Sequence, residues 1–190
     1  AGADISDFHS FRDDPGARAH FRRAMRHGLD ALRNLAIPTL AVVDGACYGA
    51  GVALAIACDL RFAGPSASFA ITPAKLGISY PQEDIHRLVS LIGPGQASWL
   101  LFAAQRIEGA EAERIGLVER FAATELAAEV AEFARSVAEN APESLALLKR
   151  GVALAASNIA QDDRQDEGFD ALLGSELLAE KILPFRRREA

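Results

Sequence analysis

Residues 37–64 have the sequence IPTLAVVDGACYGAGVALAIACDLRFAG, and this stretch decides the fold. Residues 39–43 (TLAVV) are apolar and partly β-branched and end at an Asp-Gly pair, which predicts a short buried strand. A glycine-rich turn then leads into an apolar helix over residues 51–58, and residues 59–63 (DLRFA) form another short strand. Strand, helix and strand in such a short span predict parallel strands joined by a right-handed crossover.

The flanking sequence predicts an α/β first half and an all-helical second half. We place the boundary between an α/β core at residues 1–125 and a helical region at residues 126–190. The other predicted elements are helices over residues 17–34, 85–92, 96–104 and 111–116, an extended segment over 68–71, an edge strand over 118–121, and four helices after residue 124 that end near residues 140, 158, 173 and 188.

Composition excludes several classes of protein. The chain has 190 residues and a formal net charge of −6, which suits one globular domain and gives no basic footprint for nucleic acid. No apolar run approaches the ~20 residues of a membrane helix, and no signal peptide is visible. Both cysteines, Cys47 and Cys58, lie in apolar surroundings, so we expect a reducing, cytoplasmic location without disulfides. No Cys/His cluster has metal-ligand spacing, so no metal site is expected.

The turn Gly49-Ala50-Gly51 is the first candidate for chemistry. Small residues at a helix N-terminus allow close approach to the backbone, and the free N–H groups favour developing negative charge. Two such N–H groups that face one carbonyl oxygen form an oxyanion hole. The alternative is a tight strand-to-helix connection with no chemical role. The stretch is neither a GxGxxG fingerprint nor a P-loop.

Residues 72–84 (TPAKLGISYPQED) are the second candidate. A hydroxyl such as that of Tyr80 can donate or accept a hydrogen bond at a reacting group, or it can belong to a half-buried loop aromatic. Glu83 and Asp84 lie in a predicted loop before a helix, where Asp84 is the natural N-cap. His86 is expected to face solvent or to pair with a carboxylate.

Several motifs, in this order, resemble the crotonase (enoyl-CoA hydratase/isomerase) superfamily. They are AGADI at residues 1–5, the stretch 37–64, SFAITPAKLGISYPQEDIHRLVSLIG at 68–93, IEGAEAERIGLVERF at 107–121 and the C-terminal segments 139–152 and 175–190. The resemblance implies a ClpP/crotonase spiral fold of ββα units with a C-terminal helical region that assembles a homotrimer or a dimer of trimers. It also implies a β-rich segment before AGAD, so we expect that this N-terminal segment is missing here.

The same resemblance implies an acyl-CoA thioester as the substrate. Coenzyme A is then part of the substrate, and no separate cofactor is expected. The thioester carbonyl would lie between the backbone N–H groups of Ala1 and Ala50, which would stabilise an enolate. The residues implied on the coenzyme A side are Gly2, Ala3, Asp4, Ile5 and Gly49, with Phe185 near the adenine.

The sequence departs from the superfamily at the residues that perform hydration. The two glutamates of typical hydratases would fall at Ala53 and Pro73, and neither residue can act as an acid or a base. The pattern of Thr72 and Tyr80 resembles methylmalonyl-CoA decarboxylases, in which these two residues flank the acyl carboxylate. Loss of CO₂ produces an enolate without a strong base. That subfamily usually has a glutamate at Ala53 and a histidine at Ala3.

We therefore expect decarboxylation of a malonyl-type acyl-CoA, or double-bond isomerisation, rather than hydration. In the isomerase alternative, Glu83 or Asp84 moves a proton between two carbons of the acyl group. A second alternative is a catalytically degenerate homologue that only binds acyl-CoA. A third is a helical interaction module, which predicts no concave pocket behind the turn at residues 49–51.

Overall fold

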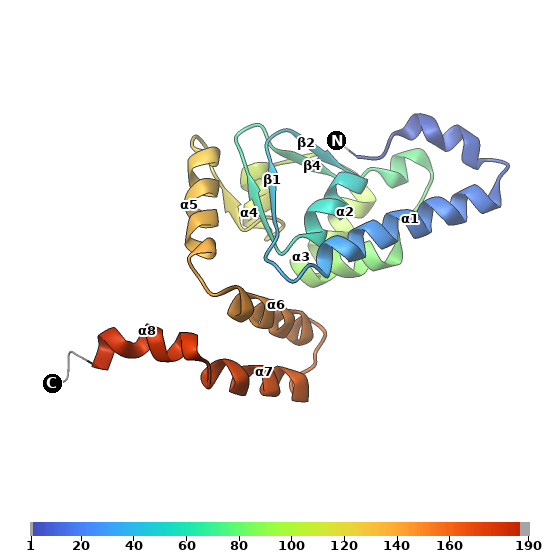
Figure 1. Ribbon diagram of the computed structural model, residues 1–190. Coiled ribbons are helices and arrows are strands. Elements are labelled where there is room, and N and C mark those ends of the chain that lie inside the picture. The colour runs from blue at the N-terminus through green and yellow to red at the C-terminus, as the bar shows by residue number, and fades with distance from the viewer. Residues whose placement is uncertain (1, 187–190) are drawn as a thin grey trace. The chain divides into compact units, whose positions relative to one another are not determined.

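The computed structural model describes residues 2–186, apart from the side chains of residues 7, 10 and 184–186. The chain divides into two compact units, one formed by residues up to Leu35 with Thr39–Ala134, the other by Ala36–Pro38 with the residues from Arg135 onward. The first unit mixes helices and strands, whereas the second contains helices only in its described part (Figure 1). No described helix combines the length and the apolar character needed to cross a membrane.

The first unit extends beyond residue 125, where the sequence predicts a boundary. Leu126 is buried with Phe62 and Ala122 in a small cluster, against which Phe133 also packs. The rings of Phe62 and Phe133 lie 5.3 Å apart between their centroids. These contacts attach most of the helix that follows residue 125 to the first unit.

The strands of the first unit have two to four residues each and are closely spaced. In chain order they are η1 (Ile5–Phe11), α1 (Pro15–Arg33), β1 (Leu40–Val43), β2 (Ala46–Tyr48), α2 (Ala50–Ala57), β3 (Leu60–Ala63), β4 (Ser68–Ala70), η2 (Pro73–Leu76), α3 (Gln82–Ala103), β5 (Ile107–Glu108), α4 (Gly109–Arg114), β6 (Arg120–Phe121) and α5 (Leu126–Ala138), which crosses the boundary.

The first four strands alternate between two three-stranded sheets, one ordered β1-β3-β6 and the other β2-β4-β5. β1 and β3 pair in parallel, with Leu40 opposite Leu60, and β2 pairs in parallel with β4. Each ββα step therefore adds one strand to each sheet before a helix follows. This arrangement confirms the predicted parallel crossover and the crotonase-like fold of ββα units.

Several elements differ from the sequence prediction, including β5 and η2, which it does not contain. β2 and the 3₁₀ helix η1 occupy segments that the sequence analysis assigned to a turn and a loop. α3 begins at Gln82, and its N-cap is Pro81, so the prediction of Asp84 as the N-cap is wrong. The predicted break between two helices does occur, since Gly93 has φ 75° and ψ 163° within α3.

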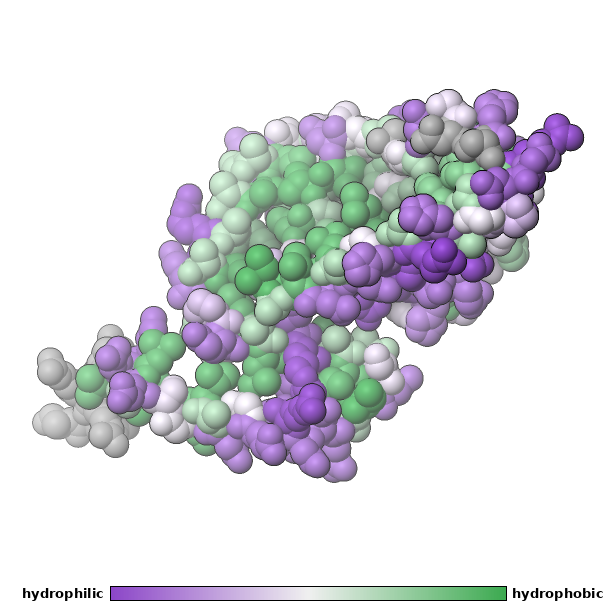
Figure 2. Space-filling model, turned by 45° about the vertical axis from the view of Figure 1, so that its right-hand side comes forward, coloured by the Kyte–Doolittle hydropathy of each residue, from purple (hydrophilic) through white to green (hydrophobic). Residues whose placement is uncertain are grey.

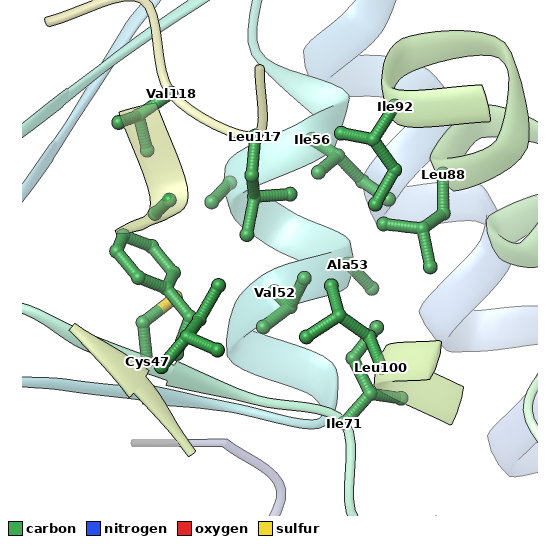
Figure 3. Packing of buried hydrophobic residues seen from close by; sticks show 14 of the residues in the cluster. Cys47, Val52, Ala53, Ile56, Ile71, Leu88, Ile92, Leu100, Leu117 and Val118 are labelled. Carbon is green, nitrogen blue, oxygen red and sulfur yellow. The ribbon is translucent and has the colours of Figure 1, made fainter. Parts of the chain in front are cut away.

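Helix α2 lies at the centre of the core. Five of its eight residues are buried: Val52, Ala53, Ala55, Ile56 and Ala57. Figure 3 shows Val52 and Ile56 among side chains from α3, from the end of β4 and from the segment after α4, including Leu88, Leu100, Ile71 and Leu117. A helix that buries most of its apolar side chains is held mainly by packing, which fixes the position of its N-terminus.

The second unit consists of helices with apolar side chains left exposed. Its helices are the end of α5, then α6 (Pro142–Ala156), α7 (Asp163–Leu173) and α8 (Glu176–Arg186). α6 and α7 are joined by an ion pair of 2.7 Å between Arg150 and Asp162. Leu148 and Val152 on α6 remain 64% and 71% exposed.

The first unit also exposes apolar surface. On the face shown in Figure 2, apolar residues gather in a broad area over this unit. Val42 of β1 and Leu54 of α2 are about half exposed, and both line a hollow of about 410 Å³.

Candidate active site

A pocket of about 410 Å³ opens at the N-terminus of α2, within the first unit. Its lining residues are Gly2, Ala3, Ile5 and Phe8 from the N-terminal segment, Phe21 and Met25 from α1, Tyr48, Gly49, Ala50 and Ala53 around the start of α2, and Thr72, Pro73, Leu76, Ile78, Ser79, Tyr80 and Pro81. None of these side chains is charged. The alternative of a helical module without a pocket at residues 49–51 is wrong.

The turn before α2 holds its backbone in a conformation that glycine accepts readily. Gly49 has φ 49° and ψ −112°, and its N–H donates a hydrogen bond of 2.9 Å to the carbonyl of Ala70. The Gly49 carbonyl accepts from the N–H groups of Val52 and Ala53 at 3.0 and 3.2 Å. Ala50 is the first helical residue, so its N–H has no acceptor within the helix. The positive end of the helix dipole lies at the same point.

The N-terminal segment lies against this turn. A Cβ atom on Gly2 would collide with the carbonyl oxygen of Tyr48 and would stand 3.7 Å from the nitrogen of Ala50. Only a glycine allows this close approach. Ala1, the other predicted oxyanion donor, lies outside the described residues.

Asp4 has a structural role and does not line the pocket. Its Oδ1 accepts hydrogen bonds of 2.9 and 2.7 Å from the N–H and hydroxyl of Ser6, which makes it the N-cap of η1. These hydrogen bonds lower the pKa of the Asp4 carboxyl. Of the predicted coenzyme A contacts, Gly2, Ala3, Ile5 and Gly49 do line the pocket. The Phe185 side chain lies outside the described part of the chain.

The two positions at which the family resemblance places the glutamates of typical hydratases meet at the pocket. Ala53 lies in the first turn of α2 and Pro73 begins η2, and both belong to its lining. A methyl group and a pyrrolidine ring therefore stand where two carboxylates would activate water.

Thr72 and Tyr80 lie on the same pocket. Thr72 precedes η2, and its side chain makes no capping hydrogen bond there. Tyr80 is 8% exposed, and its hydroxyl donates a hydrogen bond of 3.0 Å to the carbonyl of Gly49. Burial, together with the negative charge of Asp84, raises the pKa of the Tyr80 phenol. The phenol therefore stays protonated at neutral pH.

Glu83 and Asp84 lie in the first turn of α3 and not in a loop, and neither lines this pocket. Asp84 is fully buried, with its Oδ1 2.9 Å from Arg26 Nη1 and 3.8 Å from Arg87 Nη1. Glu83 lines a separate hollow of about 340 Å³ beside α1. Asp84 thus binds α3 to α1, a role that no local sequence signal indicates.

The pocket walls also include residues that sequence reasoning did not assign to a site. Phe8 and Phe21 belong to a cluster of three phenylalanines, with their ring centroids 5.8 Å apart, that packs η1 on α1. The helical spacing of Phe21 and Met25 predicts only an apolar face, and Phe8 lies in a segment predicted as a loop. Together with Met25 the two phenylalanines make one side of the pocket suited to an apolar group.

The fold and this pocket define a crotonase-like α/β protein, and comparisons with known proteins agree. The model of the enoyl-CoA hydratase/isomerase family matches residues 1–173. The chain therefore belongs to the enoyl-CoA hydratase/isomerase family of the crotonase superfamily.

Individual relatives include both hydratases and isomerases. A short-chain-enoyl-CoA hydratase of Clostridium acetobutylicum is 35% identical over 153 residues, covering 80% of this chain and 58% of that protein. A mitochondrial Delta(3,5)-Delta(2,4)-dienoyl-CoA isomerase of Dictyostelium discoideum is 32% identical over 149 residues, covering 77% and 49%. The chain thus spans about half the length of these curated relatives.

Solved structures match the fold over nearly the whole chain. A putative enoyl-CoA hydratase/isomerase family protein of Hyphomonas neptunium superimposes with a TM-score of 0.90 at 33% identity, covering 99% of this chain and 72% of that one. An enoyl-CoA hydratase/carnithine racemase of Magnetospirillum magneticum gives 0.91 at 26% identity, covering 98% and 70%.

Proposed function

We propose that the protein binds an acyl-CoA thioester and stabilises its enolate at the backbone N–H of Ala50. Support comes from the N–H of Ala50, which has no acceptor within its own helix and lies at the positive end of an apolar, tightly packed helix. The second N–H donor of the proposal is that of Ala1, which precedes Gly2 in the sequence. The uncharged pocket would take the acyl group. Coenzyme A is part of this substrate, and the proposal needs no separate cofactor.

Within this class of reaction, decarboxylation of a malonyl-type acyl-CoA fits the pocket best. The bond between the α-carbon and the carboxylate breaks, and CO₂ leaves. The electron pair of that bond stays on the acyl group as the enolate, which the oxyanion hole stabilises. A proton from solvent then completes the acyl-CoA product. The observation that carries this choice is the absence of a charged side chain among the described lining residues, with Ala53 and Pro73 in the glutamate positions. Thr72 and Tyr80 would lie beside the departing carboxylate.

Isomerisation is the second candidate reaction, and similarity to the Dictyostelium isomerase favours it. It needs a base that removes a proton from one carbon and returns it to another. The bases predicted for that role, Glu83 and Asp84, lie away from the pocket lining. The same lack of a base supports the alternative of a homologue that binds acyl-CoA without converting it.

A small substrate panel separates these proposals. The protein is incubated with methylmalonyl-CoA, 3-hexenoyl-CoA and crotonyl-CoA, and the products are separated by liquid chromatography, which resolves double-bond isomers of equal mass, and identified by mass spectrometry. We expect propionyl-CoA from methylmalonyl-CoA and no 3-hydroxybutyryl-CoA from crotonyl-CoA. Tight binding of all three without turnover would establish the degenerate alternative, and conversion of 3-hexenoyl-CoA alone would establish the isomerase.

The proposal includes assembly as a homotrimer or a dimer of trimers through the C-terminal helical region. Exposed apolar side chains on two helices there support it, with Leu148 and Val152 on α6 and Phe169 and Leu173 on α7 all more than half exposed. Light scattering of the purified protein tests the assembly. A monomer at micromolar concentration would contradict it.

A further inference from the structure

We propose that Tyr80 is a positioning residue of the oxyanion hole, whose hydroxyl fixes the peptide unit that carries the Ala50 N–H. The inference rests on the proposed function and assigns a task to one hydrogen bond, from the Tyr80 hydroxyl to the Gly49 carbonyl at 3.0 Å. In this role the phenol acts through the backbone and does not donate its proton to the substrate.

One peptide bond links the hydrogen bond of Tyr80 to the oxyanion donor. The carbonyl of Gly49 and the N–H of Ala50 belong to the same planar, trans unit, so they point in opposite directions and turn together. A hydrogen bond that holds the carbonyl therefore also sets the direction of the N–H. It polarises the unit as well, which makes the N–H a stronger donor.

This peptide unit needs such support because of the residue before it. Gly49 has φ 49° and ψ −112°, and glycine loses more conformational freedom on ordering than any other residue. The helix contributes hydrogen bonds to the Gly49 carbonyl from Val52 and Ala53. The Tyr80 hydroxyl is a third donor to that carbonyl, and it comes from a different part of the chain.

Tyr80 is itself firmly held. The residue is 8% exposed, and only Pro81 separates it from α3. The first turn of that helix is bound to α1 by the buried ion pair of Asp84 with Arg26 at 2.9 Å. Burial keeps the phenol protonated, so the hydrogen bond persists over the whole neutral pH range. The firmly held Tyr80 hydroxyl therefore keeps the peptide unit of the Ala50 N–H in one orientation.

Infrared difference spectroscopy of a bound, unreactive thioester tests this role. In butyryl-CoA labelled with ¹³C at the thioester carbonyl, the C=O stretch moves to lower frequency when the oxyanion hole polarises the bond. We expect this shift in the wild type and the loss of at least half of it in Tyr80→Phe. A pure proton donor would leave the shift unchanged, because no proton is transferred to this ligand. An unchanged shift in Tyr80→Phe therefore overturns the assignment.

Ser90 provides a matched control. Its hydroxyl also donates to a backbone carbonyl, that of His86 at 2.8 Å, but it lies on α3 and outside the pocket lining. Ser90→Ala should keep the full carbonyl shift, and an equal loss in both variants would contradict a specific role for Tyr80. Absence of any shift in the wild type would refute the proposed function itself, which separates that failure from the failure of this inference.

A fluorinated tyrosine at position 80 tests the same hydrogen bond by strengthening it. The chain has two tyrosines, so 3-fluorotyrosine incorporated into Tyr48→Phe protein changes position 80 alone. The fluorinated phenol is the stronger donor, and we expect a larger carbonyl shift than in unlabelled Tyr48→Phe. An identical shift would contradict the proposal.

In turnover assays Tyr80→Phe should lower kcat by about 10- to 100-fold with little change in KM, since the interaction acts mainly in the transition state.

Discussion

Replacing Ala50 by proline removes the proposed oxyanion donor with little other damage to the fold. Ala50 is the first residue of α2, where proline is favoured and where the N–H has no partner within the helix. Gly49, the preceding residue, has φ 49° and ψ −112°, a mirror image of the extended conformation that a residue before proline adopts. We therefore expect Ala50→Pro to fold and to lose less than about 1 kcal/mol in free energy of unfolding.

The expected loss of activity follows from the loss of one N–H. Removal of a single oxyanion donor costs about 10²–10³ in kcat, or roughly 3–4 kcal/mol of transition-state stabilisation. Turnover is measured on the thioester that proves active, and urea unfolding reports stability in parallel. Ala50→Gly is the matched variant, because it loses the methyl group but keeps the N–H, and its kcat should fall by less than about 10-fold. A kcat for Ala50→Pro within about threefold of the wild type would refute the oxyanion assignment.

Two further predictions concern stability and reactivity. Asp84→Ala should lower the free energy of unfolding in urea by about 3–5 kcal/mol, because it leaves Arg26 without its buried partner. Glu111→Ala is the control, since it breaks an exposed ion pair and should cost at most about 1 kcal/mol. Equal losses in the two variants would contradict the structural role of Asp84. Burial raises the pKa of the Cys47 thiol from 9.0 to about 11, so its reactive thiolate is about 100-fold scarcer at pH 8. Iodoacetamide followed by peptide mass spectrometry should therefore label the half-buried Cys58 well before Cys47, and rapid labelling of Cys47 in folded protein would contradict its burial.

The central ββα step could be predicted from the sequence because its signals are local. The apolar run of β1, the Asp-Gly turn after it and the unbroken apolar helix α2 all lie within residues 37–64. β2 escaped prediction because three residues between Gly45 and Gly49 look like part of a turn. Its strand character comes from pairing with β4, in which Ala46 lies opposite Ser68. Because β4 follows β2 by about 20 residues, this pairing leaves no alternation of apolar and polar residues within β2 that a local sequence signal could reveal.

The site was predictable in part for the same reason. The family motifs located Ala50, Thr72 and Tyr80, and all three line one pocket. The contact of the Tyr80 hydroxyl could not be read from the sequence, because its acceptor is a backbone carbonyl 31 residues away. The ion pair of Asp84 was missed likewise, since Arg26 lies 58 residues earlier in the chain.

The central claim is that this pocket forms an enolate without a catalytic carboxylate side chain. One competition experiment tests it most directly. Equal concentrations of methylmalonyl-CoA and crotonyl-CoA are incubated with the protein in D₂O, and both products are quantified by mass spectrometry. The ratio of products then gives the ratio of kcat/KM values. The account predicts propionyl-CoA with one deuterium at its α-carbon and no 3-hydroxybutyryl-CoA. Faster formation of 3-hydroxybutyryl-CoA would contradict it, because hydration would then proceed with Ala53 and Pro73 in the glutamate positions.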